Sequence, residues 1–280
     1  SGVINIALEG IMVVGGLAGV LVTASLPANM APALIVLAAV VAAAVCGMLY
    51  SLLLAFASIN LKADQTIGGT ALNMLATAIA MILAKNFNGS TSAKISYTNK
   101  PFLFSIGGLE LSIFIPLGIV LLVVSYIVMY KTRFGLRLRA CGEHPQAADS
   151  VGINVYKMRY AGVLISGFLG GIGGLAYTVA AGSGFNSDVG GYGFLALAVM
   201  IFGNWKPFPI LASSVFFALF KVIAAYSSSL SFLPKFDGVK EISNFYQMLP
   251  YIVTMIVLIF TSKNSQAPKA EGIPYDKGSR

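Results

Sequence analysis

The chain has 280 residues, of which 57% are hydrophobic and only 10% are charged, and its formal net charge is +8. A soluble domain usually carries about a quarter of charged residues, so the composition excludes an ordinary soluble protein and indicates a membrane protein. The two cysteines lie in different surroundings, Cys46 in an apolar run and Cys141 in a polar stretch, and neither belongs to a metal-ligand pattern.

Apolar segments long enough to span a membrane follow one another along the chain. A helix needs roughly 20 mainly apolar residues to cross the hydrocarbon core, and the sequence therefore predicts an all-α polytopic membrane protein with about eight transmembrane helices. The sixth segment is short and follows a glycine-rich loop, so we expect a partly broken helix there; broken helices usually line a cavity. The predicted spans are 3–23, 33–59, 67–84, 112–130, 160–181, 190–205, 207–227 and 248–260.

The positions of the basic residues indicate the orientation. If the segment between the fourth and fifth spans lies in the cytoplasm, twelve of the 18 Lys and Arg residues fall on that side. The positive-inside rule predicts this asymmetry, which explains the charge excess without a nucleic-acid partner. We expect a transmembrane domain over residues 1–262 and a cytoplasmic tail over 263–280, with both ends of the chain in the cytoplasm. Because the chain enters an apolar segment at Ser1 without a Met, we also expect helical sequence upstream.

A polar stretch, residues 139–155, interrupts the apolar sequence after a basic cluster. Pro145 suits the first position of a short helix, and Gly152 suits the residue just past its end. Ala147, Ala148 and Val151 then share one face, which can dock into a groove on another protein. The alternative is a solvated loop with a single helical turn.

A few polar side chains lie inside the predicted spans, where ionisable groups are costly and tend to face a bundle interior or a water-filled cavity. Glu9 and Asn73 are either polar contacts in a translocation path or interhelical hydrogen bonds that only pack the bundle. Lys221 can snorkel towards the membrane surface. The candidates for a substrate path are Asn5, Glu9, Asn73, Phe194 and Asn204.

The sequence contains no set of residues typical of catalysis. Its single histidine, His144, lies in the polar stretch, and no G-x-x-x-x-G-K-[ST] motif is present, so this chain cannot bind ATP through a P-loop. No metal-ligand spacing occurs. We therefore expect a transport subunit without a cofactor or an ATPase site of its own, and not an enzyme.

Residues 2–10 (GVINIALEG) resemble the opening signature of permease subunits of ABC importers of the ribose and branched-chain amino acid type. They are most similar to the nucleoside branch, which works with lipoproteins of the basic-membrane-protein class. Residues 139–153 (RACGEHPQAADSVGI) resemble the cytoplasmic coupling loop of that family. Residues 190–199 (GGYGFLALAV) and 203–207 (GNWKP) resemble its late signature, and 267–275 (APKAEGIPY) is similar to nucleoside-branch endings.

The resemblance implies a permease in a bacterial cell membrane that moves nucleosides by alternating access. It would contact membrane lipid, pair with a second permease subunit, receive substrate from an extracellular lipoprotein, and bind a cytoplasmic ATPase that holds ATP and Mg. The implied ATPase-coupling residues are Gly142, Glu143, His144, Pro145, Ala147, Ala148, Ser150, Val151 and Gly152.

Two alternatives to a nucleoside importer stay open on the sequence. The same type of permease can serve a simple, ribose-like sugar. An ion-coupled secondary transporter is the other alternative, but we would expect carboxylates inside several of its spans, whereas Glu9 alone lies inside one here.

Overall fold

The computed structural model describes residues 1–27, 29–89, 91–182, 184–226, 248, 252–253, 255–256 and 267–278. The chain forms two compact units, one of Ser1–Phe194 with Pro268–Arg280 and one of Leu195–Ala267. In the described residues, five helices are long and apolar enough to cross a membrane, and two shorter apolar helices follow them. The predicted helical membrane fold is confirmed, while most of the predicted span 248–260 lies outside the described residues.

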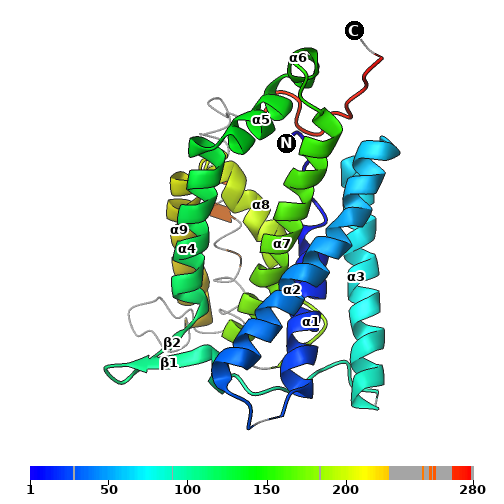
Figure 1. Cartoon of the computed structure of the whole chain (residues 1–280). Coiled ribbons are helices and arrows are strands. Elements are labelled where there is room, and N and C mark those ends of the chain that lie inside the picture. Colours follow the sequence, from blue (N-terminus) through cyan, green and yellow to red (C-terminus); the bar gives the residue numbers. More distant parts are fainter. Residues whose placement is uncertain are drawn as a thin grey trace, which may run out of the picture. The chain divides into compact units, whose positions relative to one another are not determined.

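Most of the described helices belong to the first unit (Figure 1). They are α1 (Leu8–Ser25), α2 (Pro32–Ala55), α3 (Gln65–Asn88), α4 (Phe114–Lys131), α5 (Arg133–Glu143), α6 (Pro145–Ser150) and α7 (Val155–Ala181). A π-helical turn, Phe56–Asn60, extends α2, and a 3₁₀ turn covers Lys100–Phe102. Helix α8 (Tyr192–Phe202) begins in the first unit and continues into the second, which also holds α9 (Pro207–Ala225).

Local sequence signals set several helix ends. The Asp64 carboxylate accepts hydrogen bonds from the backbone N–H groups of Thr66 and Ile67, and so caps the start of α3. The Asn154 side chain accepts from the N–H of Lys157 at the start of α7 in the same way. Gly182 ends α7 in the left-handed conformation, with a φ of 65°.

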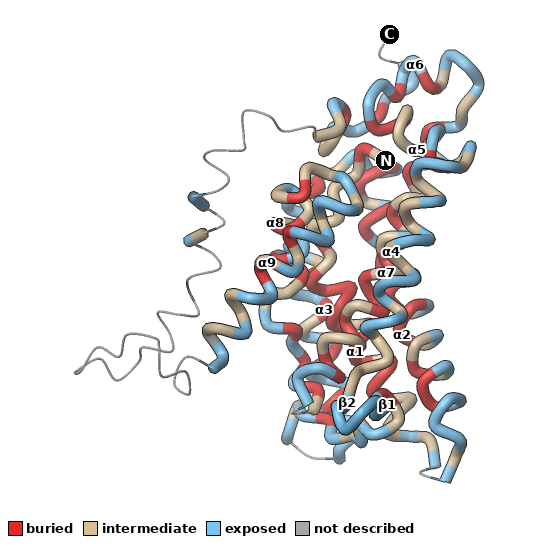
Figure 2. Tube along the Cα trace, turned by 90° about the vertical axis from the view of Figure 1, so that its left-hand side faces the viewer, coloured by how far each residue is buried: buried red, intermediate tan, exposed pale blue. Residues whose placement is uncertain are grey.

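The centre of the first unit is the contact of α1, α2 and α7, where buried residues concentrate (Figure 2). Glycines let these backbones touch: a Cβ added at Gly174 would collide with the carbonyl oxygen of Met12, and one added at Gly171 would collide with that of Ala43. Small residues permit such close approach of membrane helices. At these glycines the three helices therefore pack backbone against backbone.

The other two long helices of this unit are much less covered. Helix α3 packs along α1 through its small residues Ala76, Ala80 and Ala84, which are fully buried. None of the side chains of α4 is buried within the described part of the chain. An apolar helix left this bare is suited to contact lipid or another protein chain.

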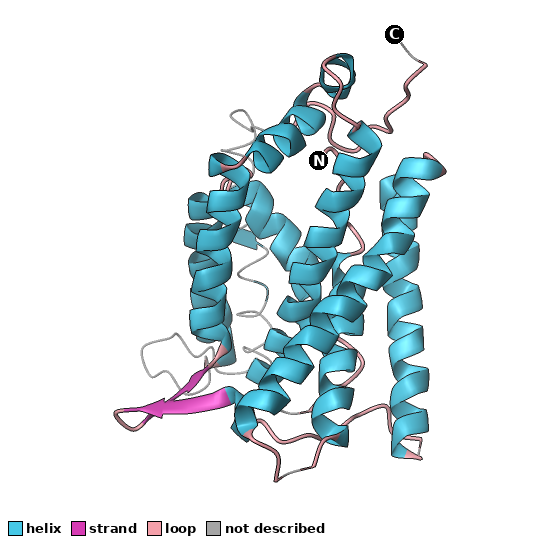
Figure 3. Ribbon diagram, viewed as in Figure 1, coloured by secondary structure: helices cyan, strands magenta, loops and turns pink. Residues whose placement is uncertain are grey.

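The segment between α3 and α4 contains ordered structure. Strands β1 (Leu103–Ile106) and β2 (Leu109–Ser112) form an antiparallel hairpin (Figure 3). Gly107 and Gly108 join them with φ values of 60° and 85°, as a two-residue type I′ turn requires. In the first unit, the hairpin and the α5–α6 segment lie at opposite ends, called here the hairpin end and the α6 end.

The preceding loop is fastened to the far end of α7 and to the chain that follows it. Ile95 and Phe185 exchange two backbone hydrogen bonds, of 2.9 and 3.0 Å, and both side chains are fully buried. The Tyr97 hydroxyl donates to the carbonyl of Thr178 at 2.7 Å, and the Asn99 amide donates to that of Val179 at 3.3 Å. This loop is thus an integral part of the hairpin end.

The second unit pairs the later part of α8 with α9 around phenylalanine rings. Phe202 stacks on Phe216 and meets Phe217 edge-on, with ring centroids 5.8 and 5.6 Å apart. Asn204 and Trp205 turn the chain between the two helices with φ values of 52° and 57°. Such values are uncommon for residues other than glycine, which marks a tight turn here.

Candidate functional site

The first candidate site surrounds the start of α1, where the chain changes from extended to helical. The predicted span 3–23 is wrong at its beginning, because residues 1–7 are not helical and α1 starts at Leu8. Extended backbone inside a membrane protein needs partners for its polar groups. Two side chains of α3 supply them here. The Gln65 oxygen accepts from the N–H of Ile4 at 2.7 Å, and the Asn73 amide donates to the carbonyl of Ile6 at 2.9 Å.

Asn73 forms hydrogen bonds on both sides of the start of α1. Besides its bond to Ile6, its Oδ1 accepts from the N–H of Gly10 in the first turn of α1, at 2.8 Å. A first-turn N–H has no partner inside its own helix, so the asparagine replaces a missing intrahelical acceptor. Asn73 is 8% exposed, and the interhelical bonding considered for it is observed. A role in translocation stays a prediction.

Glu9, also in the first turn of α1, makes the second connection. Its Oε1 accepts from the N–H of Gly191 at 2.8 Å, and its Oε2 accepts from the N–H of Gly193 at 2.6 Å. These two groups lie at the N-terminus of α8, where the helix dipole favours a negative charge. With 9% of its surface exposed, the carboxylate bridges the starts of two helices. The interhelical bond considered for Glu9 is therefore present, and its place in a substrate path is not tested by it.

The backbones come close at this point because residue 193 is a glycine. A Cβ there would collide with the backbone of Glu9. Gly190 and Gly191 precede it with φ values of 62° and 76°, which L side chains rarely adopt. The glycine-rich start of the sixth predicted span thus allows both the turn into α8 and the approach to α1. The break expected within this span is not seen in α8, which is continuous from Tyr192 to Phe202. We call Glu9, Asn73, Gly191 and Gly193 the junction.

An aromatic pair lies next to the junction. The rings of Tyr177 on α7 and Tyr192 on α8 are 4.6 Å apart at 45°. A Cβ added at Gly190 would come within 2.8 Å of the Tyr177 hydroxyl. Sequence reasoning missed both tyrosines. The available signals were the place of Tyr192 inside the 190–199 motif and that of Tyr177 in a glycine-rich apolar helix.

The remaining candidates for the substrate path divide between the two units. Asn5 lies in the extended segment, where its Nδ2 donates to the Ser166 hydroxyl at 2.7 Å; its buried Oδ1 has no partner among the described residues. Phe194 follows Gly193 directly and is 48% exposed. Asn204 belongs to the second unit, at the end of α8. The structure thus brings Asn5, Glu9, Asn73 and Phe194 into the first unit, and Asn204 is not placed relative to them.

A separate hollow of about 520 Å³ lies towards the hairpin end. Its wall combines the ends of α1 and α2, including Thr23 and Ile35, with the loop residues Tyr97 and Lys100. Thr23 is fourteen residues beyond Glu9, or about 21 Å along α1 at 1.5 Å per residue. This hollow is therefore distinct from the junction, and the sequence did not predict it.

The predicted coupling helix is present at the α6 end. Pro145 is its first residue, and Gly152 lies just past its end with a φ of 84°. The single face predicted for Ala147, Ala148 and Val151 is wrong in one member. Ala148 is only 3% exposed and packs inward, whereas Val151 is 75% exposed and Ala147 is also exposed. The exposed residues of this segment are Glu143, His144, Gln146, Ala147, Ser150, Val151 and Gly152.

Side chains that bind metals do not gather in the described ranges, where no group of three or more His, Cys, Asp or Glu could hold an ion. The polar groups of the junction are instead hydrogen-bonded to backbone. Its chemistry is that of binding and positioning.

Comparisons with known proteins identify the family of the chain. Residues 1–261 match the family model described as branched-chain amino acid transport system / permease component. The chain is 42% identical to the nucleoside ABC transporter permease protein NupC of Lactococcus lactis, over 99% of this chain and 89% of that protein. It is 40% identical to the guanosine ABC transporter permease protein NupQ of Bacillus subtilis, over 100% and 90%.

A more distant relative carries the name of another substrate. The putative glucose ABC transporter permease protein TsgC13 of Haloferax volcanii is 31% identical, over 82% of this chain and 71% of that protein. No solved structure matches the chain. The family match and the near full-length relatives show that this multi-pass membrane protein belongs to the branched-chain amino acid transport system permease component family, as a permease of an ABC importer that is not itself the ATPase.

Proposed function

We propose that this permease carries nucleosides, with guanosine as the first substrate to test, across a bacterial cell membrane. The observation that carries the proposal is the identity of 42% and 40%, over nearly the whole chain, to relatives named for nucleosides and guanosine. The glucose-named relative is less similar and covers less of the chain. It supports a simple sugar as the second candidate substrate.

The proposed orientation puts the α6 end in the cytoplasm and the hairpin end outside. Lys62, Lys131, Arg133, Arg137, Arg139, Lys157 and Arg159 then belong to the cytoplasmic side, in line with the positive-inside rule. A permease of an ABC importer works with an ATPase and a substrate-binding protein. We further propose an extracellular lipoprotein at the hairpin end and a second permease subunit as partners, with ATP and Mg held by the ATPase.

We further propose that the junction lines the substrate path in the first unit. Asn73 is eight residues beyond the start of α3, or about 12 Å along that helix, so the junction lies well inside the bundle. Two helix N-termini, those of α1 and α8, meet there around one carboxylate. Broken helices near the membrane midplane form the binding sites of many transporters. Tyr177 and Tyr192 offer aromatic faces for a nucleobase, and the buried Oδ1 of Asn5 offers an acceptor.

Coupling to the ATPase is assigned to the exposed surface of α6 and its flanking residues. Helix α6 packs between α5 and α7, and its exposed side chains are those that a partner protein would contact. ATP binding would then favour one arrangement of the permease over another through this contact. A ligand shifts such an equilibrium only by its difference in affinity for the two states.

The test is uptake of labelled guanosine by vesicles that contain the full complex. We expect uptake that requires ATP, is inhibited by unlabelled nucleosides and is unaffected by excess glucose or ribose. Val151→Asp, on the exposed surface, should abolish uptake while leaving membrane insertion intact, because it places a charge on the docking surface. Gly152→Ala is not a suitable control, since the positive φ at that position would strain the backbone. Lys157→Ala is the matched control, with an exposed side chain next to the α6 end.

Three outcomes would contradict the proposal. Uptake driven by an ion gradient without the ATPase would indicate a secondary transporter. Inhibition by sugars alone would shift the assignment to the sugar branch. Normal uptake by the Val151→Asp variant would remove the coupling role of α6.

A further inference from the structure

Residues 268–278 are not detached from the membrane bundle. The N–H of Ala270 donates to the carbonyl of Gly142 at the end of α5, at 2.9 Å, and the N–H of Gly272 donates to that of Gly2 at 3.1 Å. The predicted boundary between the transmembrane domain and the tail, at 262/263, lies outside the described residues. Residues 268–278 of the predicted tail belong to the first compact unit. We call residues 268–278 the strap.

One bond of the strap reaches a buried cation. Arg159, in the second turn of α7, is 1% exposed, and its Nη1 donates to the carbonyl of Ile273 at 2.9 Å. Its Nε and Nη2 have no partner among the described residues. A buried guanidinium with unsatisfied donors is costly. The carbonyl from the strap therefore replaces part of the hydration that Arg159 loses.

The most important apolar contact of the strap is made by the aromatic side chain of Tyr275, which is 5% exposed. It forms a small buried cluster with Cys141 of α5, Ala148 of α6 and Val155 of α7. Its ring also meets that of Tyr156 edge-on, with centroids 5.4 Å apart. A single side chain of the strap thus shares a buried cluster with three successive helices, and Ala148 faces inward into this cluster.

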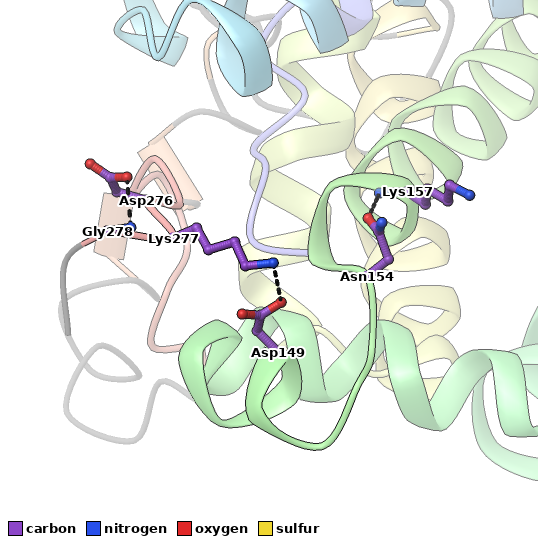
Figure 4. Close-up of polar contacts among 6 residues, drawn as sticks. All are labelled: Asp149, Asn154, Lys157, Asp276, Lys277 and Gly278. Atoms are coloured by element: carbon purple, nitrogen blue, oxygen red, sulfur yellow. Dashed lines mark hydrogen bonds and ion pairs between the residues drawn. The ribbon is translucent and has the colours of Figure 1, made fainter.

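The two residues after Tyr275 carry opposite charges and reach different elements. The Asp276 carboxylate lies 3.0 Å from Lys62 Nζ, in the connection between α2 and α3. Lys277 Nζ lies 3.9 Å from the carboxylate of Asp149 on α6 (Figure 4). Figure 4 also shows the second bond of Asp276, to the N–H of Gly278. The strap is therefore connected at one point to α6 and at another to the α2–α3 connection.

We propose that the strap fixes α6 in the position from which it engages the ATPase, so that the C-terminal tail is a working part of the coupling element. A helix of six residues has no stability of its own, and its position is set by tertiary contacts. The strap covers the inward side of α6 and leaves Ala147 and Val151 exposed. This inference rests on the proposed role of α6 and adds the residues that position it.

Cys141 offers a natural reporter of strap docking. Its thiol is fully buried in the Tyr275 cluster, and this burial raises the pKa of Cys141, which further lowers its reactivity. In a full-length chain with Cys46→Ala, maleimide labelling reports on Cys141. We expect Tyr275→Ala to speed labelling at least about tenfold, because the strap opens locally. Lys269→Ala, an exposed position on the same segment, is the control and should label at the wild-type rate.

The functional measurement is retention of the cognate ATPase by the permease in nanodiscs, followed by nucleoside transported per ATP hydrolysed. Tyr275→Ala should reduce both. Lys277→Glu should weaken retention about two- to fivefold, the range expected for one exposed ion pair, and adding Asp149→Lys should restore it. Restoration by the exchanged pair excludes a merely unfolded variant.

The results separate this proposal from the substrate assignment. If the wild-type permease retains the ATPase but does not transport guanosine, the proposed substrate fails, and reduced ATPase retention by Tyr275→Ala still supports the strap. If Tyr275→Ala exposes Cys141 yet retains the ATPase and transports normally, the strap has no coupling role. If Cys141 stays protected in Tyr275→Ala, the docking itself is contradicted.

Discussion

The junction and the strap both hold a short or interrupted helix in place, but with different interactions. The junction uses buried hydrogen bonds from Asn73 and Glu9 to backbone groups. The strap uses an aromatic side chain and two ion pairs whose lysines are 44% and 69% exposed. Water can replace the ion pairs when they break, whereas buried backbone groups have no substitute. The junction should therefore be the stiffer of the two, and the strap the one that responds to solution conditions.

The largest loss of stability is expected from a substitution that removes the hydrogen bonds of the junction but keeps the side-chain volume. Asn73→Leu leaves the Gly10 N–H and the Ile6 carbonyl unpaired, at a cost of about 1–3 kcal/mol for each buried group. Thermal unfolding in detergent should show the loss. Thr77→Val is the control, because the Thr77 hydroxyl donates only within α3, to the carbonyl of Asn73 at 3.2 Å. Equal melting temperatures of the two variants would contradict the bridging role of Asn73.

Gly193→Ala should be the next most severe change. Its methyl group meets the backbone of Glu9, so the two helices must separate, at a cost of about 1–3 kcal/mol for overpacking. We expect a lower melting temperature and a large loss of uptake. Gly68→Ala in α3 is the matched control, since nothing lies within 4 Å of the added Cβ. A Gly193→Ala variant as stable as Gly68→Ala would show that the close contact is absent.

High salt should affect the strap and spare the junction. Raising NaCl to about 1 M shortens the screening length to about 3 Å and weakens the exposed ion pairs of Asp276 and Lys277. Labelling of Cys141 in the Cys46→Ala background should then rise about twofold, which corresponds to the few tenths of a kcal/mol expected of such pairs. The salt response should shrink in Lys277→Ala. An equal response in both chains would mean that the ion pairs do not hold the strap.

The smallest expected effect is the pH dependence of the stability that Asp276 contributes. The hydrogen bond from Lys62 holds the pKa of Asp276 below its usual value, so the ionised form stabilises the folded chain. That stability is present above the unfolded pKa, about 3.9, and is lost as the pH falls through the lower folded value. The difference in melting temperature between wild type and Asp276→Asn should stay constant from pH 7 to about 5 and shrink below about 4. A difference that grows on acidification would have the wrong sign.

Much of the helical framework could be predicted from hydrophobicity alone. The predicted spans 33–59, 67–84, 112–130 and 160–181 correspond to α2, α3, α4 and α7, and Pro145 and Gly152 correctly marked the ends of α6. The start of α1 could not be predicted this way. Residues 3–7 are apolar enough to be helical, but their backbone is not helical and is bonded by the tertiary partners Gln65 and Asn73 at Ile4 and Ile6.

Other features depend on contacts between distant residues. Ala148 faces inward into a cluster that includes Tyr275, which is more than a hundred residues away in sequence. The partners of Glu9 are the glycines at the start of α8, so an interhelical bond could be considered from the sequence, but its partners could not be named. The hairpin was not predicted, although Gly107–Gly108 between two short apolar runs is a recognised turn signal.

The glycine contacts between α1, α2 and α7 have a mechanical consequence. Where backbones touch, no side chain can change rotamer to absorb sliding, so we expect the three helices to move together. The first turns of α7 contact the strap through Val155 and Arg159. Near its other end, Tyr97 and Asn99 donate hydrogen bonds to the carbonyls of Thr178 and Val179. Its 27 residues form a rod about 40 Å long. A displacement applied at the α6 end would then be carried along this rod to the loops at the hairpin end.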